Sequence, residues 1–187
     1  MDTVKPMRAD ARRNYERLLE EAKAAFGKRG VDASLEDIAR NAGVGIGTLY
    51  RHFPTREALL ETLLRERFDD QAAAARELLE HPEPVEALKI WLREISRASA
   101  VYHGLAGMMA TALSDETSQL YASCHAMQEA LSHLVERARL LGGVPADITS
   151  RELLLLVHAV AWASQHQESA DGVDRLFDLV FGGLRPS

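Results

Sequence analysis

The segment GIGTLYRHFPTR, residues 45–56, holds the side chains whose types and spacing best suit recognition of another molecule. Arg51 could form two parallel hydrogen bonds to the edge of a guanine, and Ile46 could contact the methyl group of a thymine. The groups that could donate hydrogen bonds to phosphates or bases are Thr48, Tyr50 and His52. Gly45 and Gly47 add no side chain, so the backbone could approach a partner closely. Together these are the groups with which proteins read double-stranded DNA.

A helix-turn-helix would position these groups. Ser34 can cap a short helix, and a glycine-containing turn over residues 43–45 then leads into a second short helix, residues 46–52. In the second helix Leu49 and Phe53 would face the core. The positions expected to point outward are Ile46, Thr48, Arg51 and His52. A DNA-reading helix requires these two faces, one that packs on the core and one that contacts the bases.

Helix N-termini on either side of this unit could add phosphate contacts. Ser34 and Thr55 each begin a predicted helix, and Arg56 adds a positive charge. A longer first helix is expected over residues 9–28, preceded by a short and mostly positive arm. The basic residues of that arm are Lys5, Arg8, Arg12 and Arg13. A solvated charged face and a contact to DNA explain them equally well.

The remaining sequence is helical as well, because apolar residues recur at helical spacing and alternating β-branched runs are absent. We predict an all-α fold of about nine helices, with a linking helix over residues 55–81. The later helices are expected at residues 85–101, 105–113, 115–141, 150–167 and 172–181. The predicted domains are a DNA-binding unit, residues 1–56, and a larger unit, residues 57–187, with the boundary along the linking helix.

Charge is divided unevenly along the 187 residues. Residues 1–56 carry a net charge of +3 and residues 57–187 carry −9, which together give the −6 of the whole sequence. A basic N-terminal segment followed by an acidic remainder of the chain is compatible with a DNA-facing N-terminal domain. The sequence predicts no secretory signal, and its longest apolar run, residues 153–163, is shorter than the roughly 20 residues of a membrane span. A cytoplasmic location is therefore expected.

The string IARNAGVGIGTLYRHFPTREALL, residues 38–60, resembles the signature of the TetR, or tetracycline-repressor-like, family. The resemblance covers roughly residues 9–65. It implies an all-helical regulator that dimerises through its last two helices and holds a ligand cavity in the larger domain. By position, it places Thr48, Tyr50 and His52 at DNA and Arg56 at a phosphate. The family often has Ser and Lys where this chain has Gly45 and Ile46, so one hydroxyl and one charge are missing.

The larger domain contains candidate residues for a ligand pocket and a dimer interface. Aromatic side chains and flexible apolar side chains such as methionine suit a pocket for a largely apolar molecule. For any one of these residues, however, core packing is the more frequent role. The pocket candidates are Trp91, Tyr102, Met108, Met109, Tyr121, Cys124, Met127, His158 and Trp162. The last two helices are apolar around most of their circumference, which favours cover by a second subunit. The interface candidates are Leu154, His158, Trp162, His166, Leu176, Phe177 and Val180.

Other reactive side chains are better explained without special chemistry. His125, Glu129 and His133 form a helical stripe that could bind a metal, but an exposed titratable face is the favoured interpretation. Cys124 has no second cysteine to pair with. No nucleophile lies at a recognisable spacing from a base, so we expect neither an enzyme nor a cofactor or metal.

The sequence thus predicts a homodimeric bacterial transcriptional regulator, a repressor that a small-molecule effector releases from palindromic operator DNA. Two alternatives remain open. One is a small-molecule binding protein whose DNA-binding module is vestigial, and the other is a transcriptional activator. Operator binding that weakens steeply with salt would separate the first alternative from a working regulator.

Overall fold

A computed structural model describes residues 4–101, 113–164 and 172–181 of the chain. The predicted helix at residues 105–113 lies almost entirely outside these ranges. So do the pocket candidates Tyr102, Met108 and Met109 and the interface candidate His166. Within the described residues the secondary structure is helical, with eight α-helices and one short 3-10 helix and no strand. The prediction of an all-α fold is confirmed.

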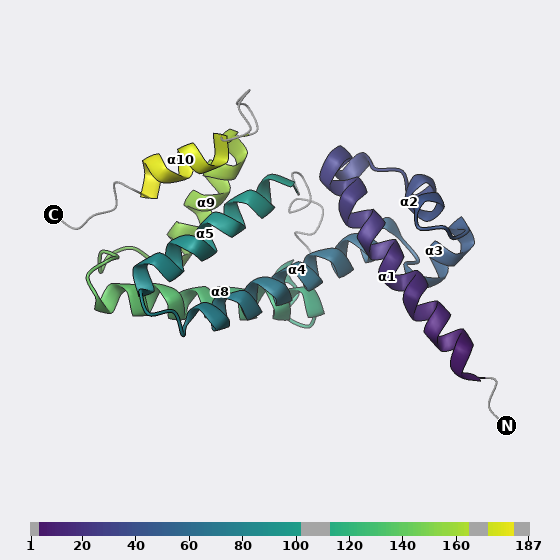
Figure 1. Cartoon of the computed structure of the whole chain (residues 1–187), viewed down its shortest axis with the longest axis horizontal. Helices are drawn as coiled ribbons and strands as arrows, with labels where there is room; N and C mark the ends of the chain where they lie inside the picture. The colour runs from purple at the N-terminus through teal and green to yellow at the C-terminus, as the bar shows by residue number, and fades with distance from the viewer. Residues whose placement is uncertain (1–3, 102–112, 165–171, 182–187) are drawn as a thin grey trace.

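The first four elements form a compact N-terminal unit (Figure 1). They are α1 (Val4–Arg29), the 3-10 helix η1 (Gly30–Asp32), α2 (Leu35–Asn41) and α3 (Ile46–His52). The bounds predicted for α3 are confirmed. Gly30 and Gly43 have φ angles of 60° and 70°, so each takes the left-handed conformation that turns the chain after a helix. The prediction of an arm ahead of the first helix is wrong, since α1 already begins at Val4.

The core of this unit forms where the apolar stripes of its helices meet. Ile38 of α2 and Leu49 of α3 are completely buried, and Leu18 and Phe26 of α1 are equally inaccessible. The first turns of the next helix, α4 (Arg56–Leu78), complete this core with four leucines, Leu59, Leu60, Leu63 and Leu64. The short helices are therefore held by packing, because helices of seven residues are too short to be stable alone.

Helix α4 extends from the N-terminal unit into the C-terminal part and connects the two cores (Figure 1). Phe68, near its middle, packs against both hydrophobic clusters. Leu120 from the start of a later helix, α8 (Gln119–Leu140), joins the N-terminal core. Helices α4 and α8 lie side by side along much of their length. A movement of α4 would therefore affect both units.

The C-terminal core is built around α5 (Pro84–Val101), α8, α9 (Ser150–Ser164) and α10 (Gly172–Phe181). Helix α5 packs on α8, α9 and α10, and α10 also packs on α9. The start predicted for α8 is four residues early, because the Ser118 side chain caps the helix by accepting a hydrogen bond from the Tyr121 N–H at 2.9 Å. Among the described residues, no helix is long and apolar enough to cross a membrane.

Candidate nucleic-acid interface and a second cleft

Two apolar side chains anchor α3 to the N-terminal core. Leu49 is fully buried and Phe53, directly after the helix, is 2% exposed. Ile46 is half-buried and also packs against this core. Ile46 is therefore turned outward only in part, and its contact with a thymine methyl group stays a prediction. Ile46 is the first residue of a helix of only seven residues. Such a short helix has too few turns for the sequence pattern to fix the direction of this side chain, so packing determines it.

The opposite face of α3 is open. Tyr50 is 45% exposed, and Arg51 is exposed as well. The Arg51 guanidinium donates a hydrogen bond from Nη2 to Thr48 Oγ1 at 2.9 Å, which orients both side chains on the same face. A Cβ atom added at Gly45 or Gly47 would meet no other group within 4 Å. The start of α3 therefore presents bare backbone beside a face of hydrogen-bonding side chains.

His52 is oriented by a ring that the sequence did not single out. Tyr15 of α1 lies edge-on to His52, with ring centroids 5.8 Å apart, and stacks on Phe53 at 5.3 Å. Burial raises the pKa of the Tyr15 hydroxyl, and the negative charge of Glu66 raises it further. Tyr15 thus remains neutral and joins α1 to the end of α3. The contact is between residues far apart in the chain, and no local pattern signals it.

The helix caps predicted beside α3 are present. Ser34 Oγ accepts a hydrogen bond from the Asp37 N–H at 3.1 Å, and Thr55 Oγ1 accepts one from the Ala58 N–H at 3.1 Å. Both residues therefore begin helices, as predicted, and their hydroxyl oxygens are engaged in capping. Whether either helix end also contacts phosphate remains a prediction.

Arg56 has a structural role. Its Nη1 donates a hydrogen bond to the carbonyl oxygen of Ala33 at 2.6 Å, and its guanidinium lies over the ring of Phe26 at 5.9 Å from the centroid. These contacts tie the start of α4 to α1 and to the chain before α2. Arg56 is half-buried and its guanidinium has further donors, so the phosphate contact expected from its position stays a prediction.

Several basic side chains of the N-terminal unit are paired with acids. Arg12 forms an ion pair with Glu16 at 3.1 Å, and Arg13 pairs with Asp10. Asp37 accepts hydrogen bonds from Arg29, at 3.1 Å, and from Arg40, and these two bonds lower the pKa of its carboxyl group. Arg12 and Arg13 remain exposed in these pairs, so a solvated charged face and a contact to DNA both stay open for them. Nothing is shown for the Arg8 side chain, which lies outside the described side chains.

The pocket candidates that the structure describes differ in burial and position. Trp91 and Met127 are buried in the C-terminal core, and the Trp91 Nε1–H donates to the carbonyl oxygen of Gln71 at 2.9 Å. Trp91 also lines a separate pocket with Leu78, His81 and Ile90, so its place in a ligand site stays a prediction, as does that of Met127. Tyr121 and Cys124 are half-buried on α8, and burial raises the pKa of the Cys124 thiol. Trp162 is 57% exposed on α9.

The interface candidates differ in burial, and two of them, His158 and Trp162, are exposed on α9. Phe177 is 1% exposed and stacks on Phe181 at 4.4 Å, so it belongs to the core of its own subunit rather than to a surface. The half-buried members that pack on this core are Leu154, Leu176 and Val180. Two strongly exposed leucines were missed, Leu155 at 60% and Leu179 at 67%. Leu155 and Trp162 are seven residues apart on α9, about two helical turns, and this spacing could have predicted that they share one exposed face of the helix.

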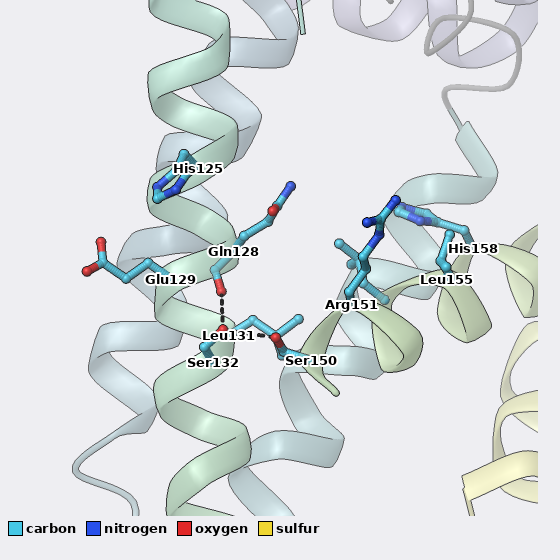
Figure 2. A pocket seen from close by; sticks show the side chains of 10 residues that line it. His125, Gln128, Glu129, Leu131, Ser132, Ser150, Arg151, Leu155 and His158 are labelled. Carbon is cyan, nitrogen blue, oxygen red and sulfur yellow. Dashed lines mark hydrogen bonds between the residues drawn. The ribbon is translucent and has the colours of Figure 1, made fainter. Parts of the chain in front are cut away.

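A cleft of about 610 Å³ lies between α8 and α9. Its lining residues are His125, Gln128, Glu129, Leu131, Ser132, Ser150, Arg151, Leu154, Leu155 and His158. Figure 2 shows Gln128 extending from α8 toward α9, while the Glu129 carboxylate points away from α9. His158 is the one pocket candidate in this lining. Among the described residues, no group of three His, Cys, Asp or Glu side chains could hold a metal ion.

An N-terminal helix-turn-helix joined by a long shared helix to a larger helical part defines the class of two-domain helix-turn-helix proteins. Residues 18–63 match the family described as bacterial regulatory proteins of the tetR family. Residues 83–186 match the C-terminal domain described as transcriptional regulator SbtR-like. The chain therefore belongs to the TetR family.

Solved structures and characterised relatives agree with this assignment. A TetR transcriptional regulator from Streptomyces coelicolor is 35% identical, with a TM-score of 0.71, over 92% of this chain and 98% of that one. A TetR regulatory protein from Mycobacterium vanbaalenii is 31% identical, with a TM-score of 0.67, over 97% of this chain and all of that one. The regulator EthR of Mycobacterium tuberculosis is 28% identical over 130 residues, which are 65% of this chain but only 59% of EthR.

Proposed function

We propose that this protein is a sequence-specific, DNA-binding transcriptional regulator and that α3 is its reading helix. The observation that carries the proposal is the two-sided construction of α3. Leu49 and Phe53 fix the helix to the core, while Tyr50 and Arg51 are exposed on the other side. In this role Arg51 selects a base, and Tyr50, Thr48 and His52 contact phosphates or bases.

The proposed functional unit is a homodimer. Two large apolar side chains of the last two helices are strongly exposed, Trp162 of α9 at 57% and Leu179 of α10 at 67%. Helices α9 and α10 lie far from α3 in the fold (Figure 1). Burial of such side chains against a second copy is favourable by about 25 cal/mol per Å² of apolar surface. A two-fold dimer would present two copies of α3 to a palindromic site, with half-sites one helical turn or a multiple of it apart.

The proposed regulation is release from operator DNA by a small molecule, which makes the protein a repressor. Support comes from α4, which contributes to the core beneath α3 and packs along α8 in the C-terminal part. A ligand that favours a different position of α4 would change the separation of the two reading helices. Only a difference in ligand affinity between the two arrangements can shift the equilibrium.

The test is selection of bound DNA from a random pool, followed by fluorescence anisotropy at several salt concentrations. We expect a palindrome whose affinity falls steeply as salt rises, because bound cations on DNA are released. Arg51→Ala should relax discrimination at one base pair, by about 1–3 kcal/mol. Arg76→Ala, which changes an exposed arginine in the last turn of α4, is the matched control and should leave operator binding unchanged.

Two results would replace this proposal. If no sequence is enriched and binding does not depend on salt, the protein is better explained as a small-molecule binding protein with a vestigial reading helix. If an operator is bound but a reporter gene under its control rises when the protein is present, the protein is an activator.

A further inference from the structure

The cleft between α8 and α9 is lined by hydrogen-bond donors from both helices and by leucines. Arg151 and His158 face it from α9, and Gln128 faces it from α8 (Figure 2). The leucines of the lining, Leu131, Leu154 and Leu155, supply the apolar part. Its volume of about 610 Å³ falls within the roughly 300–1,000 Å³ that small-molecule sites occupy.

The positive charge of Arg151 is not used by the fold. No carboxylate pairs with it among the described residues. The neighbouring Glu152 is occupied elsewhere, since its carboxylate accepts hydrogen bonds from the Thr149 N–H at 2.8 Å and from Thr149 Oγ1 at 2.7 Å. Arg151 also lies in the first turn of α9, where the helix dipole adds positive potential.

The polar groups around Arg151 are arranged to receive an acceptor. Gln128 donates one N–H to Cys124 Sγ at 3.3 Å, and its amide has a second donor that remains for a ligand. Ser132 and Ser150 are hydrogen-bonded to each other at 2.9 Å and join the two walls of the cleft. The Glu129 carboxylate, the acidic group of the lining, points away from α9 (Figure 2).

We propose that this cleft binds a small organic anion, a monocarboxylate with an apolar tail. Its carboxylate lies against Arg151, with His158 and Gln128 as further donors, and its tail covers the leucines of the lining. Arginine suits this role because its planar fork matches the two oxygens of a carboxylate.

The binding test is isothermal titration calorimetry of the full chain with sodium octanoate, 1-octanol and octylamine. Octanoate should bind most tightly, and shortening its tail should weaken binding roughly fourfold for each buried methylene. Arg151→Gln should weaken octanoate binding about tenfold or more, because a charge-assisted hydrogen bond is lost. Arg175→Gln, on an exposed arginine outside the lining, is the matched control and should bind octanoate like the unchanged protein.

Equal affinity for octanoate, octanol and octylamine would overturn the proposal, as would an Arg151→Gln protein that binds octanoate as the control does. Sedimentation of each variant shows whether Arg151→Gln alters the oligomer instead. The effector role of the anion rests on the proposed function, and operator binding is therefore measured separately. Loss of octanoate binding with operator binding intact would refute the cleft alone. Octanoate binding without any operator binding would refute the proposed function alone.

Discussion

Leu49 and Tyr50 are neighbours in α3 that face opposite sides, so alanine at each position should separate stability from DNA binding. Leu49 has no exposed surface, whereas Tyr50 is 45% exposed. Truncation of a buried leucine costs about 2–5 kcal/mol, because burial is lost and a cavity remains. That cost is a large fraction of the roughly 5–15 kcal/mol that stabilises a typical protein. Leu49→Ala should therefore strongly lower the urea midpoint of unfolding.

Tyr50→Ala should behave in the opposite way. An exposed side chain on a helix contributes about 0.5 kcal/mol or less to stability, so the urea midpoint should hardly change. Loss of one hydrogen bond to DNA, about 1 kcal/mol, should weaken operator binding roughly fivefold. Circular dichroism in urea measures the first effect, at one fixed protein concentration because a dimer's stability depends on it. Fluorescence anisotropy with operator DNA measures the second.

Either of two results would refute the orientation assigned to α3. The first is a Tyr50→Ala protein that is destabilised as much as Leu49→Ala. The second is a Tyr50→Ala protein that is folded and binds operator DNA with unchanged affinity and salt dependence. A Tyr50→Phe protein adds a control, because it retains the ring and removes only the hydroxyl.

Three further predictions concern the C-terminal part. Phe177→Ala should destabilise the protein by about 3–5 kcal/mol in urea unfolding, since its ring is 1% exposed; an unchanged midpoint would contradict its place in the core. Trp162→Glu should yield folded monomers in sedimentation if the apolar face of α9 and α10 joins two subunits, and a persistent dimer would place the interface elsewhere. Partial burial, and then the charge of Arg67, lower the pKa of His158, so the unfolded chain takes up the proton more readily. Stability should thus fall as pH drops below about 6.5, the ordinary histidine value, and His158→Gln should reduce that fall in melting temperature between pH 7 and pH 5.

The helices and their order follow from the sequence, because the signals that fix them are local. Ser34 and Thr55 each cap a helix through an N–H three residues ahead, and Gly43 supplies a left-handed turn. The inward positions of α2 and α3 follow from the same short-range spacing. The TetR signature lies in this region, so the family could also be named from the sequence.

Contacts between distant residues were decided by the tertiary structure. Arg56 donates to Ala33, 23 positions earlier, and Tyr15 stacks on Phe53 across the N-terminal core. Neither pairing leaves a periodic trace in the sequence. Together they tie α1 and the start of α4 to the helix-turn-helix.

The sequence also did not determine which side of an apolar helix is covered by its own subunit. Helix α9 is apolar around most of its circumference, so periodicity alone could not distinguish the buried Val157 from the exposed Leu155. Packing against α5 made that choice. The cleft beside Arg151 exists for the same reason, since it depends on the distance between α8 and α9. Local sequence determines where the helices form. The packing of their faces determines which side chains stay exposed and can bind another molecule.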